Sequence, residues 1–342
     1  MNYDRLTLSP VVGWPVAVGG LLAVFATYWD EAFHTDVGRD SAWAAPHLLL
    51  YGSIAVVGLG VAGWGLRVLV GTRSFRGCLA QPPLLAAGLG ALGALAAAPI
   101  DAWWHEAYGR DAVLWSPPHM LVVLASTALV LGVLSGLPAQ ARALRAVAGV
   151  LMLANAAAVV FEYEAGVPQF SEVFYVPVLL VVGLAAVWTV NQFVPVRLPA
   201  TTVVLGYAVL RVGIAGGLLV LGRSTPDLPI AALGLAAFDL PLRRTSSRFA
   251  AAAVATSTLA WLASAGSLAS AMASEVAVTA APVIVIGLVF LLAGARRGLW
   301  VAPTLLLGLA ALVTVEPDPA QAHDPGQGDP ITRLETHRHQ RR

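Results

Sequence analysis

Lysine is absent from this chain, and charge of either sign is scarce. All twenty basic residues are arginine, and charged residues make up only 11% of the 342 positions, against about 25% in ordinary soluble domains. Hydrophobic residues make up 58%, and the mean hydropathy is +0.77. The composition therefore predicts a polytopic membrane protein of bacterial type, and the net charge of +1 gives no sign of a nucleic-acid partner.

Cysteine and methionine are almost missing as well. The single cysteine, Cys78, excludes a disulfide within the chain and a cysteine-based metal site. Four methionines are too few for a ladder of soft metal ligands across the membrane. The apolar segment 11–28 lacks a small-x-small cleavage site at its end, so we expect the first transmembrane helix there and no cleavable signal peptide.

Apolar segments long enough to cross a membrane fill most of the chain. We predict an all-α bundle of about 9–11 transmembrane helices, since about 20 apolar residues span the hydrocarbon core. Candidate spans lie at 11–30, 45–68, 82–105, 117–137, 143–163, 173–194, 200–222, 227–241, 249–270, 275–295 and 298–315. The predicted domains are a metal-site membrane domain at 1–195, a second membrane subdomain of unknown role at 196–315, and a polar, disordered extracytoplasmic tail at 316–342.

Arginine placement predicts the orientation of these spans. The loops after the second, fourth, sixth, eighth and tenth spans contain arginines, whereas the opposite loops are acidic. Arginine-rich loops remain in the cytoplasm, so we expect a multi-pass protein of the inner membrane whose acidic loops face outward. The arginines that carry this prediction are Arg67, Arg73, Arg76, Arg142, Arg145, Arg197, Arg243, Arg244, Arg248, Arg296 and Arg297.

One polar pattern occurs twice in this apolar chain, and four of the seven histidines belong to it. The first copy is Asp30, His34, Gly38, Asp40, Trp43, Pro46 and His47, and the second is Asp101, His105, Gly109, Asp111, Trp115, Pro118 and His119. The two copies are offset by 71 residues, or by 72 from the tryptophan onward. The repeat units are two tandem helix-loop-helix pairs, 11–68 and 82–137, with the polar residues near the outer face.

Each copy can bring one carboxylate and two imidazoles together. Aspartate and histidine four residues apart share a helix face, and a proline before the second histidine suits the first turn of a helix. Such a set is a complete ligand shell for copper, iron or zinc with open positions. The candidate ligands are Asp30, His34, His47, Asp101, His105 and His119, supported from outside the shell by Asp40, Asp111, Trp43 and Trp115. The alternative is that these are ordinary polar residues at the headgroup level.

The spacing also resembles a known family. D-x3-H-x12-H at Asp30, His34 and His47, followed 71 residues later by a carboxylate with x3-H-x13-H, is similar to the C subunit of the copper membrane monooxygenases, which oxidise methane or ammonia. The resemblance covers roughly residues 10–195. It implies copper at the first set, an alternative copper site at the second, O2-dependent hydroxylation of a small substrate, and a hetero-oligomer with A- and B-type subunits. Asp101 departs from the family, which has asparagine at that position.

The carboxy-terminal tail contains another candidate ligand. Ala320-Gln321-Ala322 resembles a signal-peptidase site, and cleavage there would leave His323 as a new amino terminus able to chelate copper. This would be similar to the mature B subunit of the same monooxygenases, which begins with histidine. The simpler interpretation is a disordered linker.

Two other functional classes remain open on the sequence. One is a copper or zinc transporter or metallochaperone, and the other is a non-catalytic structural subunit that has kept an inherited site. The intramembrane Arg211 is expected to snorkel, to pair with an acid such as Asp239, or to line a pathway. Glu162, Glu164 and Glu172 are expected in a solvated outer loop or in an acidic funnel that collects cations.

Overall fold

The computed structural model describes residues 6–37, 43–108, 115–165, 171–264 and 275–292, and all regular structure within them is helical. The predicted all-α fold is therefore confirmed. The elements are α1 (Pro10–Val37), α2 (Ala45–Thr72), α3 (Phe75–Leu79), α4 (Pro82–Tyr108), α5 (Pro117–Gly136), α6 (Arg142–Ala157), η1 (Ala158–Val160), α7 (Phe161–Glu164), η2 (Glu172–Phe174), α8 (Tyr175–Phe193), α9 (Pro199–Val220), η3 (Ile230–Asp239), α10 (Thr245–Ser264) and α11 (Val276–Leu292).

Seven helical segments in the described residues are long and apolar enough to cross a membrane, which makes the protein a polytopic helical bundle. They are Pro10–Val37, Ala45–Thr72, Pro82–Tyr108, Pro117–Gly136, Arg142–Glu164, Glu172–Phe193 and Pro199–Val220, and they coincide with the first seven predicted spans. The apolar helices η3 and α11 are shorter. The predicted span 298–315 and the tail 316–342 lie outside the described residues.

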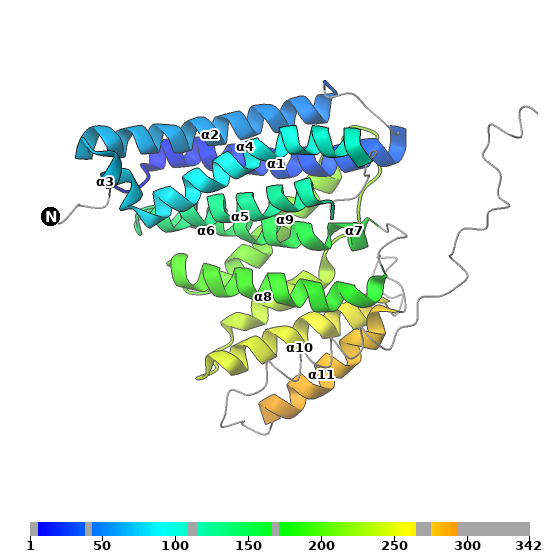
Figure 1. Cartoon of the computed structure of the whole chain (residues 1–342). Coiled ribbons are helices and arrows are strands. Elements are labelled where there is room, and N and C mark those ends of the chain that lie inside the picture. The colour runs from blue at the N-terminus through cyan, green and yellow to red at the C-terminus, as the bar shows by residue number, and fades with distance from the viewer. Residues whose placement is uncertain (1–5, 38–42, 109–114, 166–170, 265–274, 293–342) are drawn as a thin grey trace, which may run out of the picture.

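The segment from α6 to α7 is the central element of the bundle. Of its apolar window 61% is buried, against 22% for α2 and for α4, whose leucines are largely exposed. The paired helices α1 and α2 and the paired helices α4 and α5 pack on one side of α6, and α8 and α9 pack on the other (Figure 1). Beyond α8 and α9, η3 and α10 lie together, with α11 on α10. The exposed leucines suit contact with lipid chains.

Small residues bring α4 and α5 close together. A Cβ atom added at Gly90 would collide with the backbone of Ala125 and Leu129, and one at Gly132 would collide with the backbone of Pro83 and Ala87. Such close approach of two backbones is typical of helix pairs in membranes, where van der Waals packing replaces the hydrophobic driving force.

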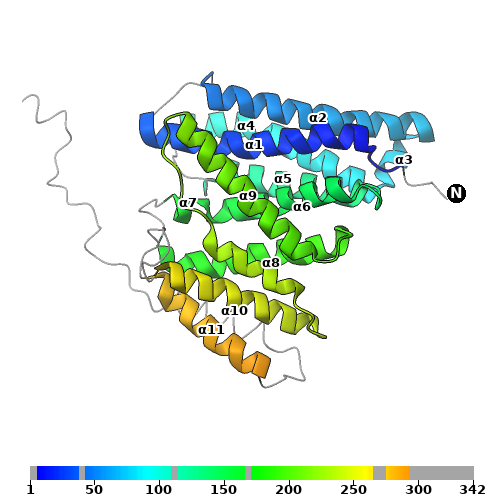
Figure 2. The same ribbon diagram turned by 180° about the vertical axis from the view of Figure 1, so that it is seen from behind.

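The bundle has two chemically different ends. At the histidine-bearing end, α1 finishes and α2 begins, and α4 finishes and α5 begins. At the opposite, arginine-bearing end lie α3 with Arg76, the start of α6 with Arg142, and the loop with Arg197 (Figures 1 and 2). Arg145 connects elements at this end by donating to the carbonyls of Leu137 and Phe193, which close α5 and α8. Arg76, Arg142, Arg145 and Arg197, which the sequence predicts on one side of the membrane, thus lie at one end of the bundle.

The predicted span 227–241 is not an α-helix. The chain turns back after α9 at Gly222, whose φ of +66° is in the left-handed region that favours glycine. It then runs without helix to Pro229 and continues as η3, a 3₁₀ helix of ten residues. The end of η3 lies at the arginine-bearing end, because the Asp239 carboxylate accepts the backbone N–H of Thr201 at the start of α9, at 2.7 Å.

Candidate metal centre

The first Asp-His-His set lies where α1 ends and α2 begins. Asp30 and His34 are one turn apart in the last part of α1, and His47 is in the first turn of α2. Pro46 immediately precedes His47 at the start of α2, a position where the missing N–H of proline costs no helical hydrogen bond. The packing of α1 along α2 then places His47 opposite Asp30.

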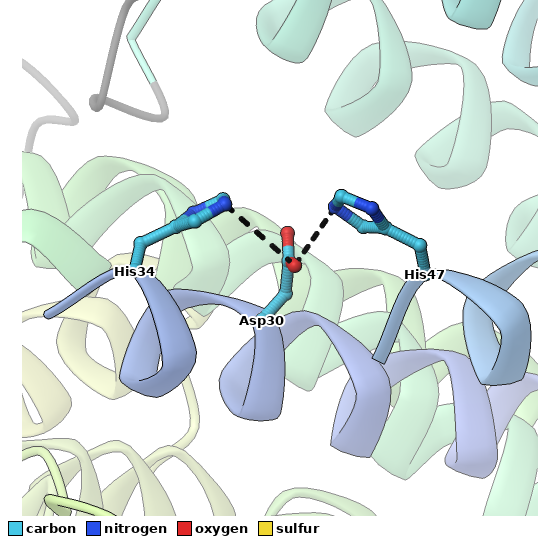
Figure 3. Close-up of side chains that lie close together, drawn as sticks. All are labelled: Asp30, His34 and His47. Carbon is cyan, nitrogen blue, oxygen red and sulfur yellow. Dashed lines mark ion pairs between the residues drawn. The ribbon is translucent and has the colours of Figure 1, made fainter. Parts of the chain in front are cut away.

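The three side chains converge on a single point. His47 Nε2 lies 2.9 Å and His34 Nε2 lies 4.0 Å from the same oxygen, Asp30 Oδ1. One ligand atom from each residue lies within 4.8 Å of the other two. Figure 3 shows the two imidazoles leaning over the carboxylate from opposite sides. This is the one such group of three histidine or acidic side chains found among the described residues.

The donor set is chemically suited to a cation. Asp30 Oδ1 is buried and faces both imidazole rings. A metal ion among the three ligands would take this oxygen and the two imidazole nitrogens as donors. The side chains are 18–35% exposed, so the site remains accessible to a metal and to a small ligand.

The second set is only partly described. His119 Nε2 lies 3.4 Å from Asp101 Oδ1, which pairs the end of α4 with the start of α5 as in the first copy. Pro118 again precedes the histidine in the first turn. His105 lies on α4, and its side chain is outside the described part of the structure. The structure therefore brings together two of the three predicted ligands of this copy.

The residues predicted to support the ligands differ in their surroundings. Trp43 is 78% exposed just before α2, whereas the indole N–H of Trp115 donates to the carbonyl of Val159 at 3.0 Å and so connects the start of α5 to η1. Asp40, Asp111 and the tail residue His323 lie outside the described residues, and their roles stay predictions.

A buried polar cluster next to this site was not predicted correctly. Arg211 does not pair with Asp239. Its guanidinium binds the Glu164 carboxylate at 2.5 Å, both side chains being 1% exposed. The expectation of a solvated loop or an acidic funnel is wrong for Glu162 and Glu164, which are 0% and 5% exposed.

The Arg211 cluster joins five parts of the fold. The guanidinium donates to the Tyr207 hydroxyl at 3.0 Å and to the Asp227 carbonyl at 2.7 Å, and it lies 4.6 Å from the centre of the Tyr28 ring. Tyr175 donates to Glu164 at 3.4 Å. Tyr28 is half a turn before Asp30 on α1, so this cluster holds the helix that carries two of the three candidate ligands. A lone arginine within an apolar span was the only signal in the sequence.

Comparison with models of protein families, with curated proteins and with solved structures finds no match to this chain.

Proposed function

We propose that Asp30, His34 and His47 bind a copper ion in a membrane protein similar to the C subunit of copper membrane monooxygenases. With partner subunits of A and B type, the site would carry out O2-dependent hydroxylation of a small substrate. The observation that supports this most directly is the convergence of the three ligand atoms within 4.8 Å from two different helices. The match of both histidine spacings to the family supports copper over other metals.

The side chains have distinct tasks in this proposal. The Asp30 carboxylate compensates part of the metal charge, and the two imidazoles supply neutral nitrogen ligands that copper, zinc and iron all accept. Three protein ligands leave coordination positions open for O2 or substrate. Copper, when bound, would supply the one-electron chemistry that O2 requires. The lipid-facing surface of the bundle would let an apolar substrate reach this end of α1 and α2 from the bilayer.

Metal analysis of the purified protein tests the proposal. The wild-type chain, His34→Ala, His47→Ala and the control Leu48→Ala are produced under copper-replete growth, and copper, zinc and iron are measured per chain. Leu48 is the neighbour of His47 and is 49% exposed. We expect copper in the wild type and in Leu48→Ala, and at least a tenfold lower copper affinity in both histidine variants, because even residues behind the ligands contribute about 10–100-fold.

Absence of metal from the wild type, or equal copper in His47→Ala and Leu48→Ala, would refute the proposal. Zinc or iron in place of copper, lost in the same variants, would keep the site and reject the monooxygenase assignment. His119→Ala adds the second copy to the same measurement. A lower copper stoichiometry in that variant would show that Asp101 and His119 are also loaded.

The transporter alternative is tested by a different readout. Reconstituted protein that accumulates copper or zinc inside vesicles, without consuming O2 in the presence of a reductant and A- and B-type partners, would favour transport. The described residues bring three metal-ligating side chains together at Asp30, His34 and His47, whereas a transport pathway would need further ligands along the spans. Copper binding without either activity would indicate a structural subunit that has kept the site.

A further inference from the structure

The arginine-bearing end contains a cavity that the proposed metal site does not use. It has a volume of about 420 Å³ and lies between the end of α8, the starts of α6, α9 and α10, and the end of η3. Its charged lining residues are Arg145, Arg197, Arg248 and Asp239. Three guanidinium groups against one carboxylate give the lining a net charge of +2.

The single carboxylate does not neutralise these arginines. Asp239 Oδ2 is occupied by the backbone N–H of Thr201, and Asp239 Oδ1 is 3.8 Å from the Arg248 guanidinium. Arg248 is held in place by donating its Nε–H to the Phe238 carbonyl at 2.6 Å. Arg197 is exposed in the loop before α9. The cavity therefore has one exposed cation, Arg197, and two cations whose side chains are held by backbone carbonyls.

The start of α9 also favours an anion in this cavity. Pro199, in the first turn of α9, also lines the cavity, so the positive end of the α9 dipole lies beside the arginines. Planar guanidinium groups are suited to phosphate because they donate two parallel hydrogen bonds.

We propose that this cavity binds the phosphate group of an anionic phospholipid. The cavity lies where transmembrane segments end, which is the level of the lipid headgroups, and basic pockets between transmembrane helices at the arginine-rich side are suited to anionic headgroups. The lipid would connect α8, α9 and α10, the three helices whose ends surround the cavity. This inference does not depend on metal binding at the opposite end.

The experiment measures lipid retention by the full chain. Wild type, Arg197→Gln and Arg243→Gln are purified in a mild detergent, incubated with equal amounts of phosphatidylglycerol or phosphatidylcholine, and examined by native mass spectrometry. Arg243 is exposed at the same end of the bundle and does not line the cavity, so its variant controls for the loss of one charge. The Arg197 side chain is exposed and makes no hydrogen bond or ion pair with the described residues, so its replacement should not unfold the protein.

We expect wild type and Arg243→Gln to retain phosphatidylglycerol over phosphatidylcholine, and Arg197→Gln to bind it about fivefold more weakly. Equal binding of the two lipids, or equal binding of phosphatidylglycerol by Arg197→Gln and Arg243→Gln, would overturn the proposal. Inorganic phosphate is added in a separate arm. Displacement of the lipid by phosphate only at large excess supports the headgroup, whereas binding of phosphate at concentrations as low as the lipid's would overturn the assignment to a lipid.

Discussion

Replacing Arg211 by methionine is expected to destabilise the bundle by about 3–5 kcal/mol, because it leaves the Glu164 carboxylate buried without its counter-charge. The two side chains are 1% exposed, and their N–O distance is 2.5 Å. The same substitution removes the donor that satisfies the Asp227 carbonyl at 2.7 Å. That carbonyl belongs to a half-buried, non-helical part of the chain, and the loss of its donor adds to the cost.

A double-mutant cycle separates the pair from the rest of the cluster. Glu164→Gln alone leaves the Arg211 guanidinium buried without a carboxylate, and we expect a loss of similar size. Arg211→Met combined with Glu164→Gln removes both charges, so its cost should fall short of the sum of the single variants. We expect the shortfall, which is the coupling energy, to be about 1–3 kcal/mol.

The assay is equilibrium unfolding of the purified chain in mixed micelles, by titration with a denaturing detergent and tryptophan fluorescence. Arg223→Met serves as the control. Its guanidinium also lies over an aromatic ring, 4.7 Å from the centre of Phe33, but has no buried carboxylate partner among the described residues, so we expect a loss of about 0.5–1 kcal/mol. Single-variant losses at Glu164 and Arg211 that add up to the loss of the double variant would refute the reasoning.

Two further variants test packing and helix termination with the same unfolding assay. Gly90→Ala should cost about 1–3 kcal/mol of stability, since its methyl group would collide with the backbone of α5. The control Gly88→Ala, on the same helix, meets no atom within 4 Å and should be close to neutral. Equal losses in the two variants would contradict the close α4–α5 contact. Arg145→Gln should cost about 1–3 kcal/mol per carbonyl left unsatisfied at Leu137 and Phe193, and unchanged stability would show that water replaces the guanidinium.

The sequence alone predicted most helices and the proximity of Asp30, His34 and His47, the first set of candidate metal ligands. Apolar length sets the positions of the first seven spans, and prolines mark the starts of α2 and α5. The i, i+4 spacing of Asp30 and His34 places both on one helix face. To predict that His47 lies near these two residues, it was enough to assume that α1 and α2 are antiparallel neighbours. A short connection between two spans favours this arrangement.

The partner of Arg211 could not be predicted in the same way. Glu164 is 47 residues away in the chain and belongs to the short helix α7, so no local period relates the two residues. Asp239 is closer to Arg211 in the sequence than Glu164 is, and it lies within an apolar segment. The structure places it at Thr201, ten residues before Arg211 on α9, which is about 15 Å along an α-helix and too far for contact. Pairings of this kind are set by how whole helices stack.

The 3₁₀ geometry of η3 has a consequence for the topology of everything that follows it. Ten residues at about 2.0 Å each reach about 20 Å, whereas the same residues in an α-helix would reach about 15 Å. Together with the extended residues before it, η3 returns the chain from the level of Glu164 to the start of α9. If only the long apolar helices are counted as membrane crossings, this return of the chain is left out. The start of α10 is then assigned to the wrong side of the membrane. A reporter fused between α9 and η3 and one fused between η3 and α10 should therefore lie in different compartments.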